Sequence, residues 1–293
     1  MQDLELRKMN MCSFQTALQV WNEGFHGYFI DLTLSLDDFL RRIMSLGISP
    51  EHSFIAFVNG QPVGFLLNGI RESLGKRYAW NGGTGVIPSF RGKGVGKMLV
   101  QVALDLYSAE SVDVAMLEAI STNESAIALY KKFGYEILEE LVVLQSDALA
   151  TDLVSSVFII TKLMPAAVGK LEFYREFSPW QCQWQSVAAG GGEAVIAVDA
   201  DRRVAGYALF ERKFDESGKP AKISMYQCEV APERGDGELV AASLLRHVFM
   251  METGNCKRLT HNLRKTNQVV IDLLTASGFT TFIEQVHMIR RLS

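Results

Sequence analysis

The chain has 293 residues, of which 48% are hydrophobic and 21% charged, and its formal net charge is −4. This composition is typical of a globular protein and excludes a disordered, collagen-like or coiled-coil chain. At about 100–200 residues per domain, the length predicts two domains, each large enough to bury a core. The slight acidic excess offers no basic surface for phosphate neutralisation, so nucleic acid is not an expected partner.

The cysteine pattern and the hydropathy indicate the cellular compartment of the protein. The four cysteines lie far apart and form no CxxC pair, which argues against a zinc site or a disulfide framework. The first ten residues carry charges where a secretory signal would need an apolar stretch. The longest apolar run, near residues 153–160, is much shorter than the ~20 residues needed to cross a bilayer. We therefore expect a cytoplasmic protein with reduced thiols, no metal site and no membrane association.

Hydrophobic periodicity predicts alternating strands and helices in the first half of the chain. Two apolar runs, residues 53–58 and 63–70, flank the turn sequence Asn59-Gly60-Gln61-Pro62 and indicate a β-hairpin. The helical spacing of apolar residues begins at Val95, and Gly134 is placed to end a second helix. The other expected elements are strands at residues 78–86, 112–119 and 135–144 and helices at residues 95–106 and 124–133. This order predicts an α/β domain with a mixed central sheet flanked by helices.

The same pattern recurs about half a chain later, which indicates an internal duplication. Val86-Ile87-Pro88 is matched by Val230-Ala231-Pro232, and Arg91-Gly92-Lys93-Gly94 by Arg234-Gly235-Asp236-Gly237. Downstream, Asn123 is matched by Asn267 and Gly134-Tyr135 by Gly278-Phe279. A change of composition over residues 145–153 predicts two domains, residues 1–145 and 146–293, the second starting with a strand near residues 156–163.

The most informative segment, residues 91–97, lies between the third strand and the first helix. Glycines at 92, 94 and 96 let successive backbone N–H groups converge, and the helix adds its unpaired N–H groups and positive dipole end. Arg91, Lys93 and Lys97 add positive charge at the same place. These features predict a pyrophosphate-binding turn in preference to a solvated surface loop.

Spacing excludes two other phosphate-binding motifs. A P-loop requires GxxxxGK followed by Ser or Thr, but Gly96-Lys97 is followed by Met98, and position 91 is Arg. A dinucleotide fingerprint requires GxGxxG within a parallel βαβ unit, whereas this segment has GxGxG after an antiparallel hairpin.

At this point the sequence resembles the GCN5-related N-acetyltransferase (GNAT) superfamily. The segment from Arg91 to Gly96 fits the superfamily's acetyl-CoA signature, Gln/Arg-x-x-Gly-x-Gly/Ala, in full. The segment from Asn123 to Tyr135, with Tyr130 in its helix, fits the second hallmark. The motifs cover roughly residues 50–145, and the weaker second copy makes the chain resemble two tandem acyl-CoA N-acyltransferase domains.

The resemblance implies roles for residues of the first copy. Backbone groups at Val86 and Ile87 would hold the pantetheine arm of acetyl-CoA and polarise its thioester carbonyl, and Asn123 would contact the same arm. The pyrophosphate would be held by the N–H groups of Arg91, Gly92, Lys93, Gly94, Val95 and Gly96 and by the charge of Lys97. Tyr130 would be the general acid, since a phenol of pKa ~10 keeps its proton at neutral pH and can donate it to the departing thiolate.

Direct attack by an amine also requires a base, because an alkyl amine of pKa ~10.4 is mostly protonated at pH 7. Glu118, near the end of the strand before Asn123, is the first candidate, and the others are His26, Tyr28 and Asp31 in the opening segment. The family often places an acid on the strand that carries Val86, but residues 78–85 contain none.

The second copy departs from the cofactor motif. Its loop is one residue shorter, Asp236 stands in place of Lys93, and Glu238 lies where it would repel a pyrophosphate. Leu274 replaces Tyr130, so the proton donor is absent. We expect this domain neither to bind acetyl-CoA well nor to catalyse transfer.

Together these features predict an acetyl-CoA-dependent N-acetyltransferase that acts on a primary amine, of a small molecule or a protein, by direct attack in the N-terminal domain. The alternative is a catalytically silent CoA-binding or scaffold protein, and turnover with a panel of amines distinguishes the two. Because one chain carries both copies, we expect a monomer or a weak dimer.

Overall fold

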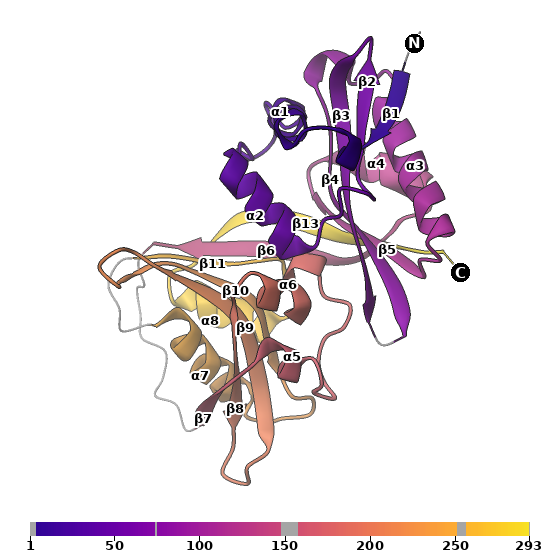
Figure 1. The fold of residues 1–293 in the computed structure, drawn as a ribbon. Helices are drawn as coiled ribbons and strands as arrows, with labels where there is room; N and C mark the ends of the chain where they lie inside the picture. Colours follow the sequence, from indigo (N-terminus) through magenta and orange to yellow (C-terminus); the bar gives the residue numbers. More distant parts are fainter. Residues whose placement is uncertain (1–3, 74, 148–157, 251–255, 293) are drawn as a thin grey trace. The chain divides into compact units, whose positions relative to one another are not determined.

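The computed structural model describes residues 4–73, 75–147, 158–250 and 256–292 (Figure 1). The chain forms two compact units, Met1–Leu138 with Val286–Ser293, and Glu139–Gln285. Each unit is a mixed sheet flanked by helices, as the periodicity predicts. In the described parts of the chain, no helix is long and apolar enough to cross a membrane.

The sheet of the first unit has the strand order β1-β2-β3-β4-β5-β13. Pairs from β1 to β4 are antiparallel, whereas β4 and β5 are parallel. Helices α1 and α2 lie on one side of this sheet and α3 and α4 on the other (Figure 1). The elements are β1 (Leu4–Lys8), η1 (Met9–Met11), α1 (Phe14–Gly24), α2 (Leu36–Leu46), β2 (Phe54–Val58), β3 (Gln61–Ser73), β4 (Lys76–Val86), η2 (Pro88–Phe90), α3 (Val95–Ala109), β5 (Val114–Ile120), α4 (Glu124–Lys132), the start of β6 (Glu136–Ser146) and the end of β13 (Thr280–Arg291).

Local sequence signals explain several helix ends. Ser13 and Ser35 cap α1 and α2, since their hydroxyl groups accept from the N–H groups of Thr16 (3.0 Å) and Asp38 (3.1 Å). Helix α2 ends at Gly47, whose left-handed conformation (φ 64°) suits a glycine C-cap.

The second unit has the strand order β7-β8-β9-β10-β11-β6, and β12 also pairs with β6. Here β10 and β11 are the parallel pair, and the pairs on either side of them are antiparallel. The elements are β7 (Ile159–Leu163), α5 (Pro165–Val168), η3 (Trp180–Cys182), α6 (Trp184–Ala189), β8 (Glu193–Val198), β9 (Val204–Phe214), β10 (Pro220–Val230), α7 (Gly237–Phe249), β11 (Lys257–Thr260), β12 (Leu263–Arg264), α8 (Gln268–Ala276), most of β6 and the start of β13.

The registers of the two units match, as a duplication requires. In the first, Gly64 lies opposite Val86, and a bulge leaves Gly82 as the extra residue on β4. In the second, Gly206 lies opposite Val230, and a bulge leaves Tyr226 as the extra residue on β10. The bulge precedes the matched valine by four residues in both units.

The units divide at a different point from the expected boundary between residues 145 and 146. Strand β6 continues past residue 138 into the second unit, where it pairs with β11 and β12. In exchange, residues 286–291 of β13 complete the sheet of the first unit beside β5. Periodicity identifies a strand but not the sheet that it joins, which is why the exchange was not expected. The strand expected near residues 156–163 is β7, and its first expected residues lie outside the described ones.

Candidate active site

Strands β4 and β5 separate towards their carboxyl ends, and this opening is the centre of the candidate site. Among the described residues, pairing extends over residues 78–81 and 114–117, although β4 continues to Val86 and β5 to Ile120. The N–H of Ile87 donates to the carbonyl oxygen of Val63 (2.9 Å). The alternation of an antiparallel ladder therefore turns the N–H of the preceding residue, Val86, away from β3 and towards the opening.

Tyr130 lies in the last turn of α4, beside this opening. Its side chain is buried, close enough to the side chains of Thr84 and Asn81 on β4 for them to lower its pKa. The bulge at Gly82 brings Asn81 and Thr84 together, and the Asn81 amide donates to the Thr84 hydroxyl (2.8 Å). Burial raises the pKa of the Tyr130 phenol, and the nearby Thr84 and Asn81 side chains partly offset this rise. The phenol therefore keeps its proton at neutral pH.

Asn123 connects the start of α4 to the loop after α1. Its Oδ1 atom caps the helix by accepting from the N–H of Ala126 (3.2 Å), and its Nδ2 atom donates to the Tyr28 hydroxyl (3.3 Å). Burial raises the pKa of Tyr28 as well. The structure thus brings together a residue expected to contact the cofactor and one of the expected base candidates.

The glycine-rich loop presents a run of free N–H groups. Gly92 and Gly94 have φ angles of 73° and 85°, in the left-handed region that favours glycine. Among the described residues, none accepts a hydrogen bond from the N–H groups of residues 92–97. A Cβ at Gly96 would lie 3.6 Å from Leu129 on α4 and 3.9 Å from Val86 on β4. The free N–H groups therefore begin close to the β4–β5 opening.

Arg91 and Ile87, which were both expected to contact the cofactor, already form hydrogen bonds within the protein. The Arg91 guanidinium donates to the carbonyl oxygens of Val86 (2.9 Å), Gly24 (3.0 Å) and His26 (3.3 Å), and the Arg91 N–H donates to Pro88 (3.2 Å). Both backbone groups of Ile87 are also used, because its carbonyl accepts from Phe90 (2.9 Å). Arg91 thus ties the loop to the end of α1. A sequence motif specifies a residue type but not its partners, so this role could not be predicted.

Lys93 and Lys97 are exposed beside this loop. The Lys93 ammonium lies 5.1 Å from the centre of the Phe90 ring. Both side chains add positive charge next to the free N–H groups, as the sequence predicts for a phosphate site.

Glu118, the first base candidate, lies on β5 with its carboxylate held. Its Oε2 atom accepts from the indole N–H of Trp80 on β4 (2.8 Å). Successive strand residues point to opposite faces, so Trp80 and Glu118 lie on one face of the sheet while Asn81 and Tyr130 lie on the other. The candidate acid and the candidate base therefore flank the opening from opposite sides.

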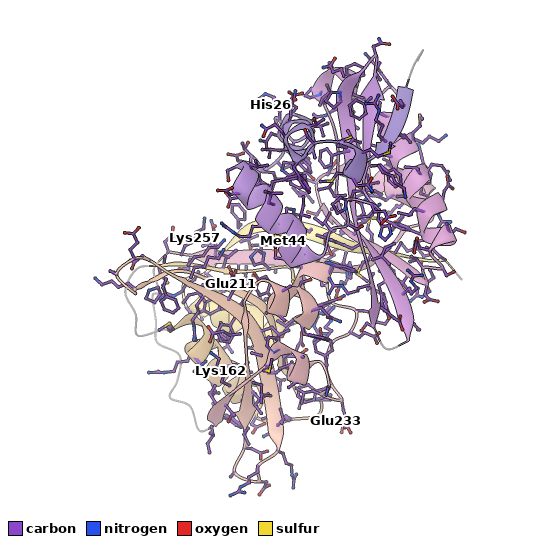
Figure 2. All side chains as sticks on the ribbon, in the orientation of Figure 1. His26, Met44, Lys162, Glu211, Glu233 and Lys257 are labelled. Atoms are coloured by element: carbon purple, nitrogen blue, oxygen red, sulfur yellow. The ribbon has the colours of Figure 1, made fainter. Side chains whose placement is uncertain are left out.

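The other base candidates in the opening segment have different surroundings. His26 is exposed at the surface beside α1 (Figure 2). The Asp31 carboxylate accepts from the N–H of Thr33 (2.9 Å), which stabilises a turn and lowers its pKa.

Arg42 on α2 also reaches this region, where its guanidinium donates to the carbonyl oxygen of Gly82 on β4 (2.9 Å). Four residues described here were not predicted from the sequence, namely Arg42, Trp80, Asn81 and Thr84. A polar Asn and Thr inside the apolar strand at residues 78–86 are a signal for two of them. No sequence signal distinguishes Arg42 from the solvent-facing charges of its amphipathic helix.

In the equivalent region of the second unit, polar side chains are bonded within the protein. The Arg234 guanidinium makes two bonds to the carboxylate of Asp236 (both 2.8 Å) and one to Asp199 (2.9 Å). Asn267, at the position of Asn123, donates to the carbonyl of Cys228 on β10 (2.9 Å). Leu274, at the position of Tyr130, is fully buried.

The carboxyl end of β10 also carries a charge that β4 lacks. Glu229, next to Val230, is buried and ion-paired with Arg264 on β12. Burial raises the pKa of this carboxyl, and the charges of Arg264 and Arg175 oppose the rise. The corresponding residue of the first unit is Gly85, which leaves its opening free of side-chain charge at this point.

Comparison with known proteins agrees with this geometry. Residues 10–135, within the first unit, match the model of the acetyltransferase (GNAT) family. The mycothiol acetyltransferase of Streptomyces griseus is 33% identical over 88 residues, which are 29% of this chain and 27% of that protein. The N-alpha-acetyltransferase 30 of Dictyostelium discoideum is 28% identical over 92 residues, or 31% of this chain and 50% of that protein. The chain thus matches half or less of the length of these curated relatives.

Solved structures share the fold along the whole chain. A putative acetyltransferase from Pyrococcus horikoshii has a TM-score of 0.67 at 18% identity and covers 100% of this chain and 91% of its own. A tandem GNAT protein from the clavulanic acid biosynthesis pathway has a TM-score of 0.63 at 15% identity, and the match covers 99% of this chain and 98% of that protein. The fold is therefore that of two GNAT domains in tandem.

Proposed function

We propose that the first unit is an acetyl-CoA-dependent N-acetyltransferase in which a primary amine attacks the thioester directly. The observation that best supports this is the buried Tyr130 phenol beside the β4–β5 opening, since burial raises its pKa and keeps it protonated at neutral pH. A loop of N–H groups without acceptors begins beside it. Transfer from a pyrophosphate-bearing thioester requires both a proton donor and an anion site.

The residues of the first unit suit acetyl-CoA along its length. The N–H groups of residues 92–97, with Lys93 and Lys97, are suited to a pyrophosphate. The Val86 N–H at the opening is suited to the pantetheine arm or the thioester carbonyl, and Asn123 lies at the other side of the opening. When bound, acetyl-CoA supplies the electrophilic carbonyl carbon.

The protein's own groups move the protons in this proposal. Glu118 takes the proton that the amine loses, and Tyr130 gives its proton to the sulfur that leaves. Because the two residues lie on opposite faces of the sheet, the acceptor can approach from the face of Glu118 while Tyr130 stays on the cofactor side. General acid or base groups of this kind contribute ~10²–10⁴-fold to rate.

The second unit has no catalytic role in this proposal and does not bind acetyl-CoA well. Asp236 and Glu238 place negative charge in its loop, and Arg234, the cation beside them, is already neutralised by Asp199 and Asp236. The loss of the tyrosine at Leu274 removes the proton donor. Like charges near a bound pyrophosphate would weaken its binding.

The acceptor in this proposal is the primary amine of a small molecule or a protein. One relative is named for mycothiol and the other for N-alpha acetylation, so the pair supports acetyl transfer without selecting one acceptor. We also propose a cytoplasmic location, from the composition and the reduced cysteines, and a monomer or weak dimer.

A panel of amines with continuous detection of the released CoA thiol tests the proposal. We expect Tyr130→Phe to lower kcat by ~10²-fold or more while acetyl-CoA still binds. Tyr135→Phe is the matched control, since it removes the hydroxyl group of another buried tyrosine. The ring centre of Tyr135 lies 5.8 Å from that of Tyr130. If no amine is acetylated and acetyl-CoA nevertheless raises the unfolding temperature, the chain is a catalytically silent CoA-binding protein.

Calorimetric titration with acetyl-CoA tests whether only the first unit binds it. We expect one equivalent of acetyl-CoA to bind per chain. A second equivalent of similar affinity would contradict the assignment of a silent second unit.

A further inference from the structure

Two neighbours of the Glu118 carboxylate have no part in the reaction as proposed so far. The indole N–H of Trp80 donates to the Glu118 Oε2 atom (2.8 Å). The guanidinium of Arg42, on α2, lies close enough for the charge of Glu118 to raise its pKa. Trp80 lies on β4, and Arg42 on α2 reaches β4 through the carbonyl oxygen of Gly82.

Arg42 is held in place by its surroundings. Its guanidinium carbon lies 5.1 Å from the centre of the Trp21 ring and 6.0 Å from that of Trp80. Its Nη2 atom donates to the carbonyl oxygen of Gly82 (2.9 Å). Burial lowers the pKa of Arg42 to about 10, against the opposing charge of Glu118. The charge of Glu118 favours the ionised form of Arg42, and the positive charge of Arg42 favours the ionised form of Glu118 in return.

The bulge in β4 connects the two faces of the site. A Cβ at Gly82 would lie 2.5 Å from the Trp80 ring, so a larger residue there would displace the indole. The same bulge brings Asn81 and Thr84 together beside Tyr130. One irregularity of a single strand thus shapes the surroundings of both the proposed acid and the proposed base.

We propose that Arg42 and Trp80 are positioning residues that hold Glu118 ionised and fixed in orientation beside the β4–β5 opening. The inference rests on the proposed function, in which Glu118 is the base. In that step the amine nitrogen bonds to the acetyl carbonyl carbon and the carbon–sulfur bond breaks, while Glu118 receives the proton of the amine and Tyr130 protonates the sulfur. A carboxylate that is protonated or turned away takes no part, so the rate depends on both neighbours.

The indole N–H resonances test this pairing without acetyl-CoA or an acceptor. The protein has four tryptophans, and Trp80→Phe identifies the resonance of Trp80. Its chemical shift should follow the protonation of Glu118 as the pH is lowered. The titration should vanish in Glu118→Gln and move up by about one pH unit in Arg42→Met. Persistence of the titration in Glu118→Gln, or an unmoved midpoint in Arg42→Met, overturns the proposal.

Three further variants separate positioning from folding and from neighbouring groups. Arg42→Lys keeps the charge and should leave the midpoint of the titration where it is in the original protein. Arg41→Met makes the same charge change at an exposed residue of α2, paired with Asp38 (3.1 Å), and should leave the midpoint unchanged. β13, the strand next to β5, carries the buried titratable group His287. If His287→Asn abolishes the titration, His287 and not Glu118 is the titrating group.

The pH profile of kcat provides the matching kinetic readout. In Trp80→Phe, which keeps a ring but removes the donor, the acid limb should move up by about one pH unit with an unchanged KM for acetyl-CoA. Profiles of Trp80→Phe and Arg42→Met that superimpose on the original would overturn positioning and leave the acetyltransferase proposal intact. If no amine is acetylated, the proposed function fails, and the indole titration still decides whether the pair exists.

Discussion

Replacing Gly96 by leucine should separate the stability of the first unit from its capacity to bind acetyl-CoA. Gly96 occupies the second position of α3, where a Cβ would lie 3.6 Å from Leu129 and 3.9 Å from Val86, both ordinary contact distances. A Cβ at this position meets no clash, and leucine favours a helix over glycine by about 0.5–1 kcal/mol. At about 2–4 °C per kcal/mol for a unit of this size, the unfolding temperature should rise by about 1–4 °C.

The same side chain should weaken the binding of the cofactor. It would fill the space between α3, α4 and β4, next to the free N–H groups of the loop. Acetyl-CoA at 100 times its Kd stabilises the native state by ~2.7 kcal/mol, which corresponds to about 5–11 °C. Scanning calorimetry should show this ligand-induced shift in the original protein and its loss in Gly96→Leu.

Gly237→Leu is the matched control for this measurement. Gly237 is the first residue of α7 in the second unit, and a Cβ there would lie 3.5 Å from Val230. This variant should keep the full ligand-induced shift. If Gly96→Leu also keeps it, acetyl-CoA does not lie over the first turn of α3 and the reasoning from the glycine loop is refuted. If the shift is lost only in Gly237→Leu, the cofactor binds the second unit.

Three further changes test the packing and ionisation described above. Gly85→Ala should destabilise the first unit by about 1–3 kcal/mol in urea unfolding, since the new Cβ would lie 2.4 Å from the Phe65 ring, and Phe65→Leu should recover part of the loss. Tyr107→Phe should cost about 1–3 kcal/mol in the same assay, because it removes the donor to the buried Asn68 Oδ1 atom (2.6 Å); an unchanged midpoint would show that this bond contributes nothing. Burial and nearby lysines lower the pKa of His261 to about 4, against ~6.5 when unfolded, so the unfolded chain binds the extra proton. Stability should therefore fall by up to ~3 kcal/mol from pH 6.5 to pH 4, and a pH dependence that persists in His261→Gln would contradict this origin.

The sequence predicts the parts of the site that depend on local chain geometry. The hairpin turn, narrowed to Asn59-Gly60, the glycines of the loop and the helix that follows are found as expected, because each is determined by residues adjacent in sequence. The cap of α4 by Asn123 belongs to the same class. Each of these features needs a single backbone conformation that only a few residue types favour.

Features that depend on contacts between distant segments could not be predicted. Arg91 donates hydrogen bonds to carbonyl oxygens at and just after the end of α1, more than 60 residues away in sequence. The pairing of Glu118 with Trp80 depends on the register of β4 against β5 and on Gly82, which leaves room for the Trp80 ring. An isolated charge such as Arg42 has the same sequence context whether its helix face is buried or exposed.

The exchange of β13 has a consequence for how the protein is made. Residues 286–291, which complete the sheet of the first unit, emerge from the ribosome after the entire sequence of the second unit. Because domains generally fold as units during synthesis, the first unit must wait with the edge of β5 uncovered while the second is translated. Synthesis of the first unit, which carries the intact cofactor motif, therefore starts before that of the second unit and ends after it. Premature termination of translation within the second unit would leave the sheet of the first unit without its last strand.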